Sequence, residues 1–226
     1  MSVNITSVRG EHHRVFVTGG TGYMGRRLVA SLVGCGHDVS VLCRPGSEEH
    51  VPKGVGIVPG DALHAASYRD TVAPCDTFVH LVGVTHPGPG KEDAFRTIDL
   101  ASIQAAVDAA VSSGVQHFVY VSVAHPAPVM HAYIEARKKG EEMIRASGMN
   151  ATILRPWYVL GPGHRWPSVL TPLYAAARLF PRLRDGARRL GLVTIRQMVA
   201  SLVHAVDHPA EGVRVVEVPA IRVGRW

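Results

Sequence analysis

RVFVTGGTGYMG, residues 14–25, is the stretch of this sequence that decides its fold. Arg14–Thr18 is an almost unbroken apolar run, which is typical of a strand buried on both faces of a parallel sheet. Gly19 and Gly22 allow a tight turn and let backbone N–H groups approach a pyrophosphate, while Gly25 lets the next helix pack against the strand. The stretch therefore predicts a strand, turn and helix that hold an anion at the helix N-terminus. The predicted cofactor-binding residues of this turn are Gly19, Thr21, Gly22, Tyr23, Met24 and Gly25.

The rest of the chain alternates strands with helices over its first 155 residues. Further strands are expected at 38–43, 55–58, 76–82, 116–122, 151–154 and 213–218, and helices around 28–33 and near 65–72, 92–113, 131–147 and 194–207. This alternation predicts an α/β fold with a doubly wound parallel sheet (Rossmann) in the strand order 3-2-1-4-5-6-7. We expect a single domain over residues 1–226, in which residues 157–195 form a small C-terminal cap on the substrate side.

The composition narrows the class of protein. The chain has 226 residues, 46% of them hydrophobic and 19% charged, so it can bury the core of one domain and does not resemble a disordered chain. Cys35, Cys43 and Cys75 have no paired spacing, which argues against a disulfide framework and a cysteine zinc site. The thirteen histidines are scattered along the sequence, so no metal is expected. With neither an apolar run of membrane-spanning length nor a secretory signal, a cytoplasmic protein is expected.

The positive charge is concentrated in one region. The chain has 24 basic and 18 acidic residues, and residues 165–196 contain seven arginines against the single acid Asp185. This placement favours a local anionic partner over specific nucleic-acid binding. The Arg-rich segment 178–196 could touch a membrane surface or an acidic protein, or close over an anionic or quinone-like small-molecule substrate. The alternative is an ordinary solvated surface.

Five segments together resemble a known superfamily over nearly the whole chain. They are TGGTGYMG at 18–25, Gly60-Asp61, HLVG at 80–83, VQHFVYVS at 115–122, and Arg155-Pro156 followed by GPG at 161–163. These segments resemble the extended and atypical short-chain dehydrogenases/reductases (SDRs), with NmrA-like and complex I accessory-subunit-like proteins as the most similar groups. The resemblance implies that Asp61 contacts adenine, that Leu81, Val82 and Gly83 pass under the cofactor, and that Pro156 lies beside the nicotinamide.

The residue after the second strand bears on cofactor choice. An NAD site usually has Asp or Glu there to accept from the ribose 2′-hydroxyl, but this chain has Cys43-Arg44. Arg44 offers a fork of donors that suits a 2′-phosphate, and Arg26 could add a second charge. NADP(H) is therefore the preferred cofactor and NAD(H) stays possible. The alternative is that Arg44 is only a solvated loop residue.

The resemblance also implies a catalytic Tyr with a Lys four residues later, usually assisted by a Ser. Tyr133 and Arg137 have this spacing, which places both on one helix face, with Arg in the place of Lys. Ser122 ends the fifth strand, while Ala124 occupies the position where extended SDRs often carry the hydroxyl. We therefore expect Tyr133 as the acid/base, Arg137 as its electrostatic partner and Ser122 to orient substrate. Tyr133 could instead be a packed helix residue.

Two functions follow from these residues. The first is an NADP(H)-dependent oxidoreductase that reduces a carbonyl, enone or quinone-like substrate. The second is a non-catalytic NAD(P)H-binding protein, either a redox sensor or an assembly factor for a membrane complex.

Overall fold

A parallel sheet of seven strands forms the centre of the computed structural model, which describes residues 12–85, 87–162 and 190–224. The strand order is β3-β2-β1-β4-β5-β6-β9, which confirms the predicted Rossmann-type α/β fold. The strands are β1 (Arg14–Thr18), β2 (Asp38–Cys43), β3 (Gly56–Pro59), β4 (Thr77–His80), β5 (His117–Val121), β6 (Asn150–Arg155) and β9 (Val213–Glu217).

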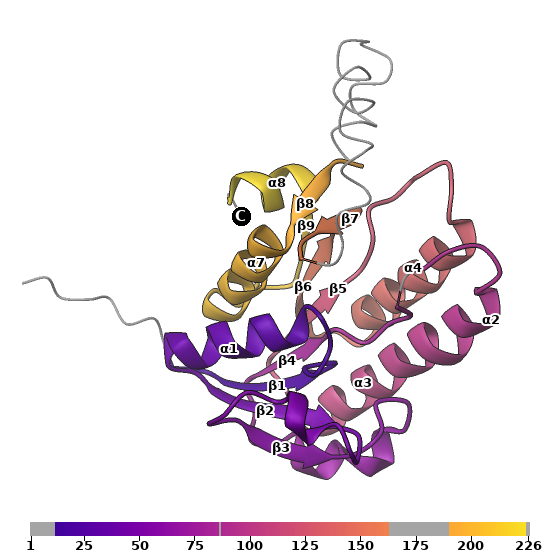
Figure 1. Ribbon diagram of the computed structural model, residues 1–226. Coiled ribbons are helices and arrows are strands. Elements are labelled where there is room, and N and C mark those ends of the chain that lie inside the picture. Colours follow the sequence, from indigo (N-terminus) through magenta and orange to yellow (C-terminus); the bar gives the residue numbers. More distant parts are fainter. Residues whose placement is uncertain (1–11, 86, 163–189, 225–226) are drawn as a thin grey trace, which may run out of the picture.

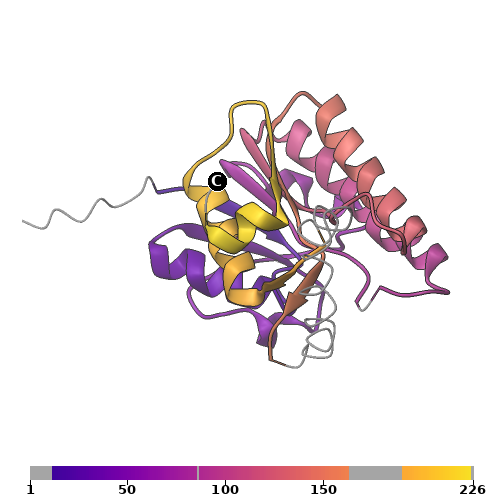
Figure 2. The ribbon, with the colours of Figure 1, turned by 90° about the horizontal axis from the view of Figure 1, so that it is seen from above.

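Helices cover both faces of this sheet (Figure 1; Figure 2). One face carries α1 (Gly25–Cys35) and α7 (Ile195–Asp207), and the other carries α3 (Ala101–Ser112) and α4 (His131–Ala146). Alternate residues of β1 pack against the helices on the two faces of the sheet, because successive side chains of a strand point to opposite faces. Val15 and Val17 are fully buried with Leu28 of α1, whereas Phe16 is fully buried with Ile103 of α3. Burial on both sides explains the unbroken apolar run.

Several connecting segments differ from the expectation. The predicted helix at 65–72 is two short 3₁₀ turns, η2 (Ala65–Ser67) and η3 (Arg69–Thr71), and another 3₁₀ turn, η1 (Glu48–His50), follows β2. The predicted helix at 92–113 begins as α2 (Glu92–Ala94) and passes through a π-helical turn, η4 (Phe95–Leu100), before α3. A final helix, α8 (Val218–Val223), was not expected, and it starts where the predicted last strand ends.

A small second sheet belongs to the region predicted as the cap. Its two parallel strands are β7 (Tyr158–Leu160) and β8 (Leu192–Thr194). The cap stays a prediction, because residues 163–189 lie outside the described part of the chain. Of the seven clustered arginines, only Arg196 falls within the described residues. Within residues 12–85, 87–162 and 190–224, no helix is long and apolar enough to cross a membrane.

Candidate cofactor and catalytic site

The glycine turn is a tight backbone cradle between β1 and α1. Gly19 has a φ of +77°, in the left-handed region. The N–H of Gly22 donates to the Gly19 carbonyl over 3.1 Å and closes the turn. A Cβ on Gly19 would lie 2.9 Å from the backbone carbonyl carbon of Leu81, and a Cβ on Gly25 would overlap the Gly19 carbonyl. Side chains at these positions would fill the turn, so the glycines keep its backbone accessible.

A cleft of about 810 Å³ opens at the carboxyl ends of the strands beside this turn. Eight of the predicted cofactor-binding residues line it: Gly19, Thr21, Gly22, Arg44, Asp61, Leu81, Val82 and Gly83. Lys91, Asp93 and Ile98, from the chain between β4 and α3, line it as well. This position, next to a free helix N-terminus and a cradle that a Cβ would fill, suits a dinucleotide. The residues present therefore fit a nicotinamide cofactor.

Arg44 and Asp61 line the cleft from the segments that follow β2 and β3. Arg44 is exposed and follows β2, where its side chain is accessible to a phosphate. Asp61 is fixed by its own turn: one carboxylate oxygen accepts from the Leu63 N–H over 3.0 Å, and the other lies 3.2 Å from Nδ1 of His64. The acid is thus oriented by local hydrogen bonds before any ligand arrives.

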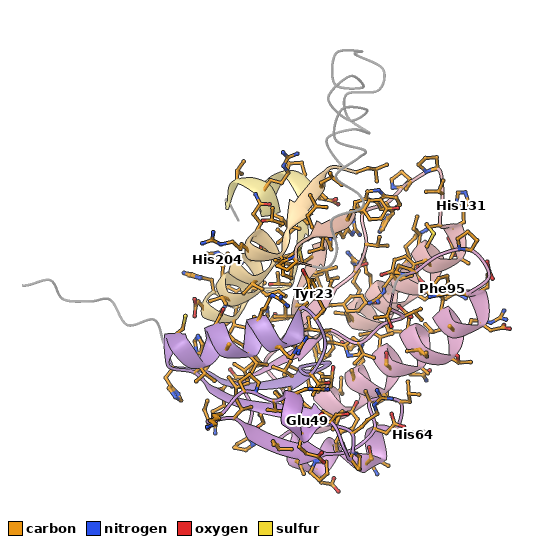
Figure 3. All side chains as sticks on the ribbon, viewed as in Figure 1. Tyr23, Glu49, His64, Phe95, His131 and His204 are labelled. Atoms are coloured by element: carbon orange, nitrogen blue, oxygen red, sulfur yellow. The ribbon has the colours of Figure 1, made fainter. Side chains whose placement is uncertain are left out.

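The other four predicted cofactor residues do not line the cleft. Tyr23 lies where α1 begins (Figure 3), and the Arg27 guanidinium carbon is 4.3 Å from its ring centroid. Met24 is the N-cap of α1, and Gly25 is needed for packing against the turn. Pro156 is buried and its carbonyl accepts from the Ala124 N–H over 2.8 Å. These four residues therefore contribute to the packing of the glycine turn and of the end of β6, outside the lining of the cleft.

His80, the first residue of the HLVG segment, is buried beneath the turn. His80 ends β4 in register with Thr18 at the end of β1, and its Nδ1 lies 2.8 Å from the Thr18 hydroxyl oxygen. Its Nε2 is 3.4 Å from the hydroxyl oxygen of Ser102. Burial lowers the pKa of His80 to about 3, with the Arg137 charge adding to the effect. The imidazole is therefore neutral and joins the two strand ends under the cofactor cleft.

Tyr133 lies on α4, half-buried against apolar side chains. Its ring centroid is 5.2 Å from that of Phe95, and the guanidinium carbon of Arg137 is 5.2 Å from the same Tyr133 ring. A small apolar cluster of Val123, Ala127 and Ile134 packs beside it, with Trp157 and Leu190 partly buried against the cluster. The predicted acid and its cationic partner are thus together, in an apolar setting.

Arg137 is buried and faces backbone and side-chain acceptors. Its Nη1 donates to the Val121 carbonyl over 2.9 Å, and its Nη2 donates to the Val82 carbonyl over 3.4 Å. Nη2 also lies 2.6 Å from the carboxylate of Asp99, which is 1% exposed. Burial raises the pKa of Asp99, although the Arg137 charge opposes the rise. Sequence reasoning missed Asp99, because a single acid in a helical pattern gives no sign of its partner.

Ser122 has its hydroxyl on a buried acid. The Ser122 Oγ donates to Glu141 Oε1 over 2.7 Å, and Arg155 and Arg145 donate to the same carboxylate. Burial alone would raise the pKa of Glu141, but the hydrogen bonds from Arg155 and Ser122 lower it to about 2. The Ser122 hydroxyl is therefore already a donor to Glu141, and its role in orienting substrate stays a prediction. Ala124 is fully buried.

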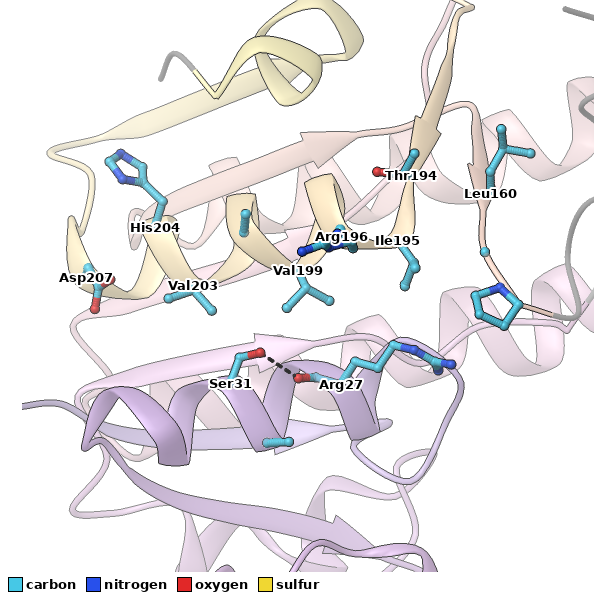
Figure 4. A pocket seen from close by; sticks show the side chains of 14 residues that line it. Arg27, Ser31, Leu160, Thr194, Ile195, Arg196, Val199, Val203, His204 and Asp207 are labelled. Carbon is cyan, nitrogen blue, oxygen red and sulfur yellow. Dashed lines mark hydrogen bonds between the residues drawn. The ribbon is translucent and has the colours of Figure 1, made fainter.

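A second cavity, of about 1200 Å³, lies on the α1 and α7 face (Figure 4). Val199 and Val203 of α7 face Arg27 and Ser31 of α1 across it, and Asp207 closes one end. None of the residues predicted for cofactor binding or catalysis lines this groove. Within the described ranges, no group of three or more His, Cys, Asp or Glu side chains could hold a metal ion.

A doubly wound sheet with a glycine turn at its central strand and a cleft at the strand ends defines a dinucleotide-binding Rossmann protein. The sequence model of an NAD(P)H-binding family matches residues 19–165. The chain belongs to this family and is an atypical member of the SDR superfamily.

Named relatives and a solved structure agree with this assignment. The ceramide reductase of Caulobacter vibrioides (strain NA1000 / CB15N) is 27% identical over 210 residues, which cover 92% of this chain and 65% of that protein. The 4-hydroxy-2-methyl-3-oxo-4-farnesyl-3,4-dihydroquinoline-1-oxide ketoreductase of Stigmatella aurantiaca is 25% identical over 170 residues, 66% of this chain and 51% of that protein. The chain thus spans between half and two thirds of the length of these relatives. The Bordetella bronchiseptica enzyme WbmH, solved with NAD⁺, has the same fold, with a TM-score of 0.68, 21% identity, and coverage of 90% of this chain and 75% of that one.

Proposed function

We propose that this protein is an NADP(H)-dependent reductase that acts on a carbonyl group within a largely apolar molecule. The observation that carries the proposal is the pairing of Tyr133 with Arg137. The guanidinium carbon is 5.2 Å from the Tyr133 ring centroid, and the guanidinium itself lies against Gly83, which lines the cofactor cleft. A phenol next to a buried cation is suited to give up its proton, because the cation stabilises the phenolate that remains.

The cofactor would be held by residues already arranged along the cleft. Gly19, Thr21 and Gly22 would present backbone to a pyrophosphate, Asp61 would contact adenine, and the exposed Arg44 would bind a 2′-phosphate. When bound, a reduced nicotinamide supplies hydride to a carbonyl carbon.

Tyr133 would give its phenolic proton to the carbonyl oxygen of the substrate as charge develops there. Arg137 keeps its place by donating to the Val121 and Val82 carbonyls, so its charge stays close to the phenol. The apolar cluster of Val123, Ala127 and Ile134 excludes water from this side of Tyr133.

The apolar surroundings of Tyr133 also support the substrate class. Phe95, Trp157 and Leu190 extend the apolar surface around the phenol. The two named relatives act on a ceramide and on a farnesyl-bearing 3-oxo compound, and both substrates carry large apolar groups. A ketone attached to a long hydrocarbon chain is therefore the substrate class we infer.

A non-catalytic NAD(P)H-binding role, as a redox sensor or an assembly factor, is the second candidate. One observation favours it: the Ser122 hydroxyl is held by Glu141, and Ala124 supplies no hydroxyl in its place. Such a protein would bind NADPH through the same cleft and use Tyr133 only for packing.

The cofactor half of the proposal is tested by fluorescence titration of NADPH and NADH. Charge-assisted contacts contribute about 1.5–3 kcal/mol each, so NADPH should bind roughly ten to a hundred times more tightly than NADH. Arg44→Asp should remove this preference, while Arg69→Asp, at an exposed position on η3, should keep it. Equal affinities of the unmodified protein for the two cofactors would contradict the NADP(H) assignment.

The catalytic half needs a substrate screen that pairs long-chain 3-oxo compounds with their short-chain counterparts, read as NADPH oxidation. Tyr133→Phe should cut turnover by about 10²–10⁴-fold, the usual effect of removing a general acid, and leave the NADPH dissociation constant unchanged. Tyr68→Phe is the matched control, because Tyr68 is buried against Phe16 in a different core cluster from that of Tyr133. Tight NADPH binding without oxidation across the panel would favour the non-catalytic role.

A further inference from the structure

The groove between α1 and α7 is a cavity that the proposed reductase function does not use. Its volume of about 1200 Å³ is ample for a small molecule, since such sites span roughly 300–1,000 Å³. The two helices run in the same direction along the groove, so both begin at the same end of it (Figure 4). Its middle is lined by apolar or small side chains: Ala30 of α1, and Val199, Ala200 and Val203 of α7.

Two guanidinium groups mark the end of the groove where both helices begin. Arg27 lies in the first turn of α1 and Arg196 in the first turn of α7, and both line the cavity. Among the residues that the structure describes, no carboxylate lies within ion-pair distance of either guanidinium. Arg196 belongs to the Arg-rich segment, whose charge favours a local anionic partner. The two helix N-termini add partial positive charge at the same end, which therefore suits an anion.

Arg27 is already held in position at the wall of the groove. Its Nη1 donates to the Tyr23 carbonyl over 2.7 Å, and its guanidinium carbon is 4.3 Å from the Tyr23 ring centroid. Tyr23 in turn packs against Gly161, since a Cβ at Gly161 would overlap the Tyr23 hydroxyl oxygen. Because these contacts already order the Arg27 side chain, binding an anion there costs less conformational entropy than binding it to a freely moving arginine.

The far end of the groove does not attract an anion. Asp207 closes it, and the Asp207 carboxylate lies 2.9 Å from Nε2 of His37. Burial, with His208 close by, lowers the pKa of His204, so this lining histidine is neutral at pH 7. The 1.5 Å rise per helical residue separates Arg196 from Asp207 by about 16 Å along α7. The groove thus offers one cationic end and a long apolar stretch.

We propose that this groove binds a free long-chain carboxylate, with the carboxylate on Arg27 and Arg196 and the hydrocarbon chain along the apolar middle. The charge at one end favours a fatty acid over an acidic peptide, because further negative charges would meet the apolar stretch and Asp207. The site is separate from the cofactor cleft, since none of the residues predicted for cofactor binding or catalysis lines the groove.

The test is calorimetric titration of the full chain with dodecanoate, below the concentration at which it forms micelles. One molecule should bind per chain. Arg27→Gln and Arg196→Gln should each weaken binding roughly tenfold, the effect of losing one charge-assisted contact. Arg26→Gln is the matched control: it makes the same change at the adjacent exposed position of α1, outside the groove, and should leave the affinity unchanged. Dodecanol has the same chain without the charge and should bind at least about tenfold more weakly than dodecanoate.

A bulky substitution shows whether the hydrocarbon chain lies in the groove. Ala200→Trp on α7 and Ala30→Trp on α1, both at exposed positions that line it, should abolish dodecanoate binding and leave the melting temperature of the ligand-free protein close to that of the unmodified chain. The proposal is overturned if dodecanoate does not bind, or if it binds these variants and the arginine variants as tightly as the unmodified protein. A dimer of the unmodified protein that Ala200→Trp dissociates, without dodecanoate binding, would assign the groove to a second copy of the chain instead. These measurements use neither cofactor nor turnover, so their failure leaves the reductase assignment as it stands.

Discussion

Acid should weaken this fold through the neutral histidine beneath the glycine turn. Burial lowers the pKa of His80 to about 3, while an unfolded histidine has a pKa of about 6.5. The unfolded chain therefore binds the proton more readily, so the contribution of His80 to stability is complete above pH 6.5 and is lost as the pH falls. Between pH 7.5 and pH 5, this linkage costs about 2 kcal/mol for the single group.

The assay is urea unfolding followed by circular dichroism at pH 7.5 and pH 5.0. His80→Gln retains polar atoms toward Thr18 and Ser102 but cannot gain a proton, so it should lose about 2 kcal/mol less than the unmodified protein between the two pH values. His50→Gln, at an exposed position on η1, is the control and should follow the unmodified protein. An equal loss in His80→Gln and in the unmodified protein would refute the reasoning.

Three further changes test other parts of the structure. Gly19→Ala forces a side chain into a left-handed conformation 2.9 Å from Leu81, so NADPH should no longer raise the melting temperature. Arg155→Met removes the bidentate pair of hydrogen bonds from Arg155 to the Glu141 carboxylate. It should lower the free energy of unfolding, measured in urea, by about 3 kcal/mol. Thr194→Ala removes the capping box of α7 and should cost about 1 kcal/mol in the same assay; a cost near zero would mean that the cap is dispensable.

The parallel sheet could be predicted because its signals are local in the sequence. The apolar run of β1 and the glycines that follow it occupy twelve consecutive residues, and the strand order follows from the alternation of elements. Strand ends moved by a residue or two, as at β4, which spans Thr77–His80 where 76–82 was expected. The apolar run continues past β4 into Leu81 and Val82, so hydrophobicity alone does not show where the last hydrogen bond of the strand lies.

The buried ionic contacts could not be predicted in the same way. The spacing of Tyr133 and Arg137 places them on one helix face, but nothing local shows that Asp99, 38 positions earlier, holds the guanidinium. Ser122 likewise has a hydroxyl that suits catalysis, and only the packing of α4 on β5 shows that Glu141 receives it. These partners are chosen by tertiary packing, so the sequence indicates the charged residues without the pairs they form.

The pairing of β7 with β8 marks a place where the sequence between the two strands can be replaced. Tyr158 lies beside Leu192, so the chain leaves and re-enters this small sheet within a few residues of the same place. The entropy needed to close such a loop rises only slowly with its length. Sequence of another length can therefore be grafted between Leu160 and Leu192 while the seven-stranded sheet and the cleft stay as they are.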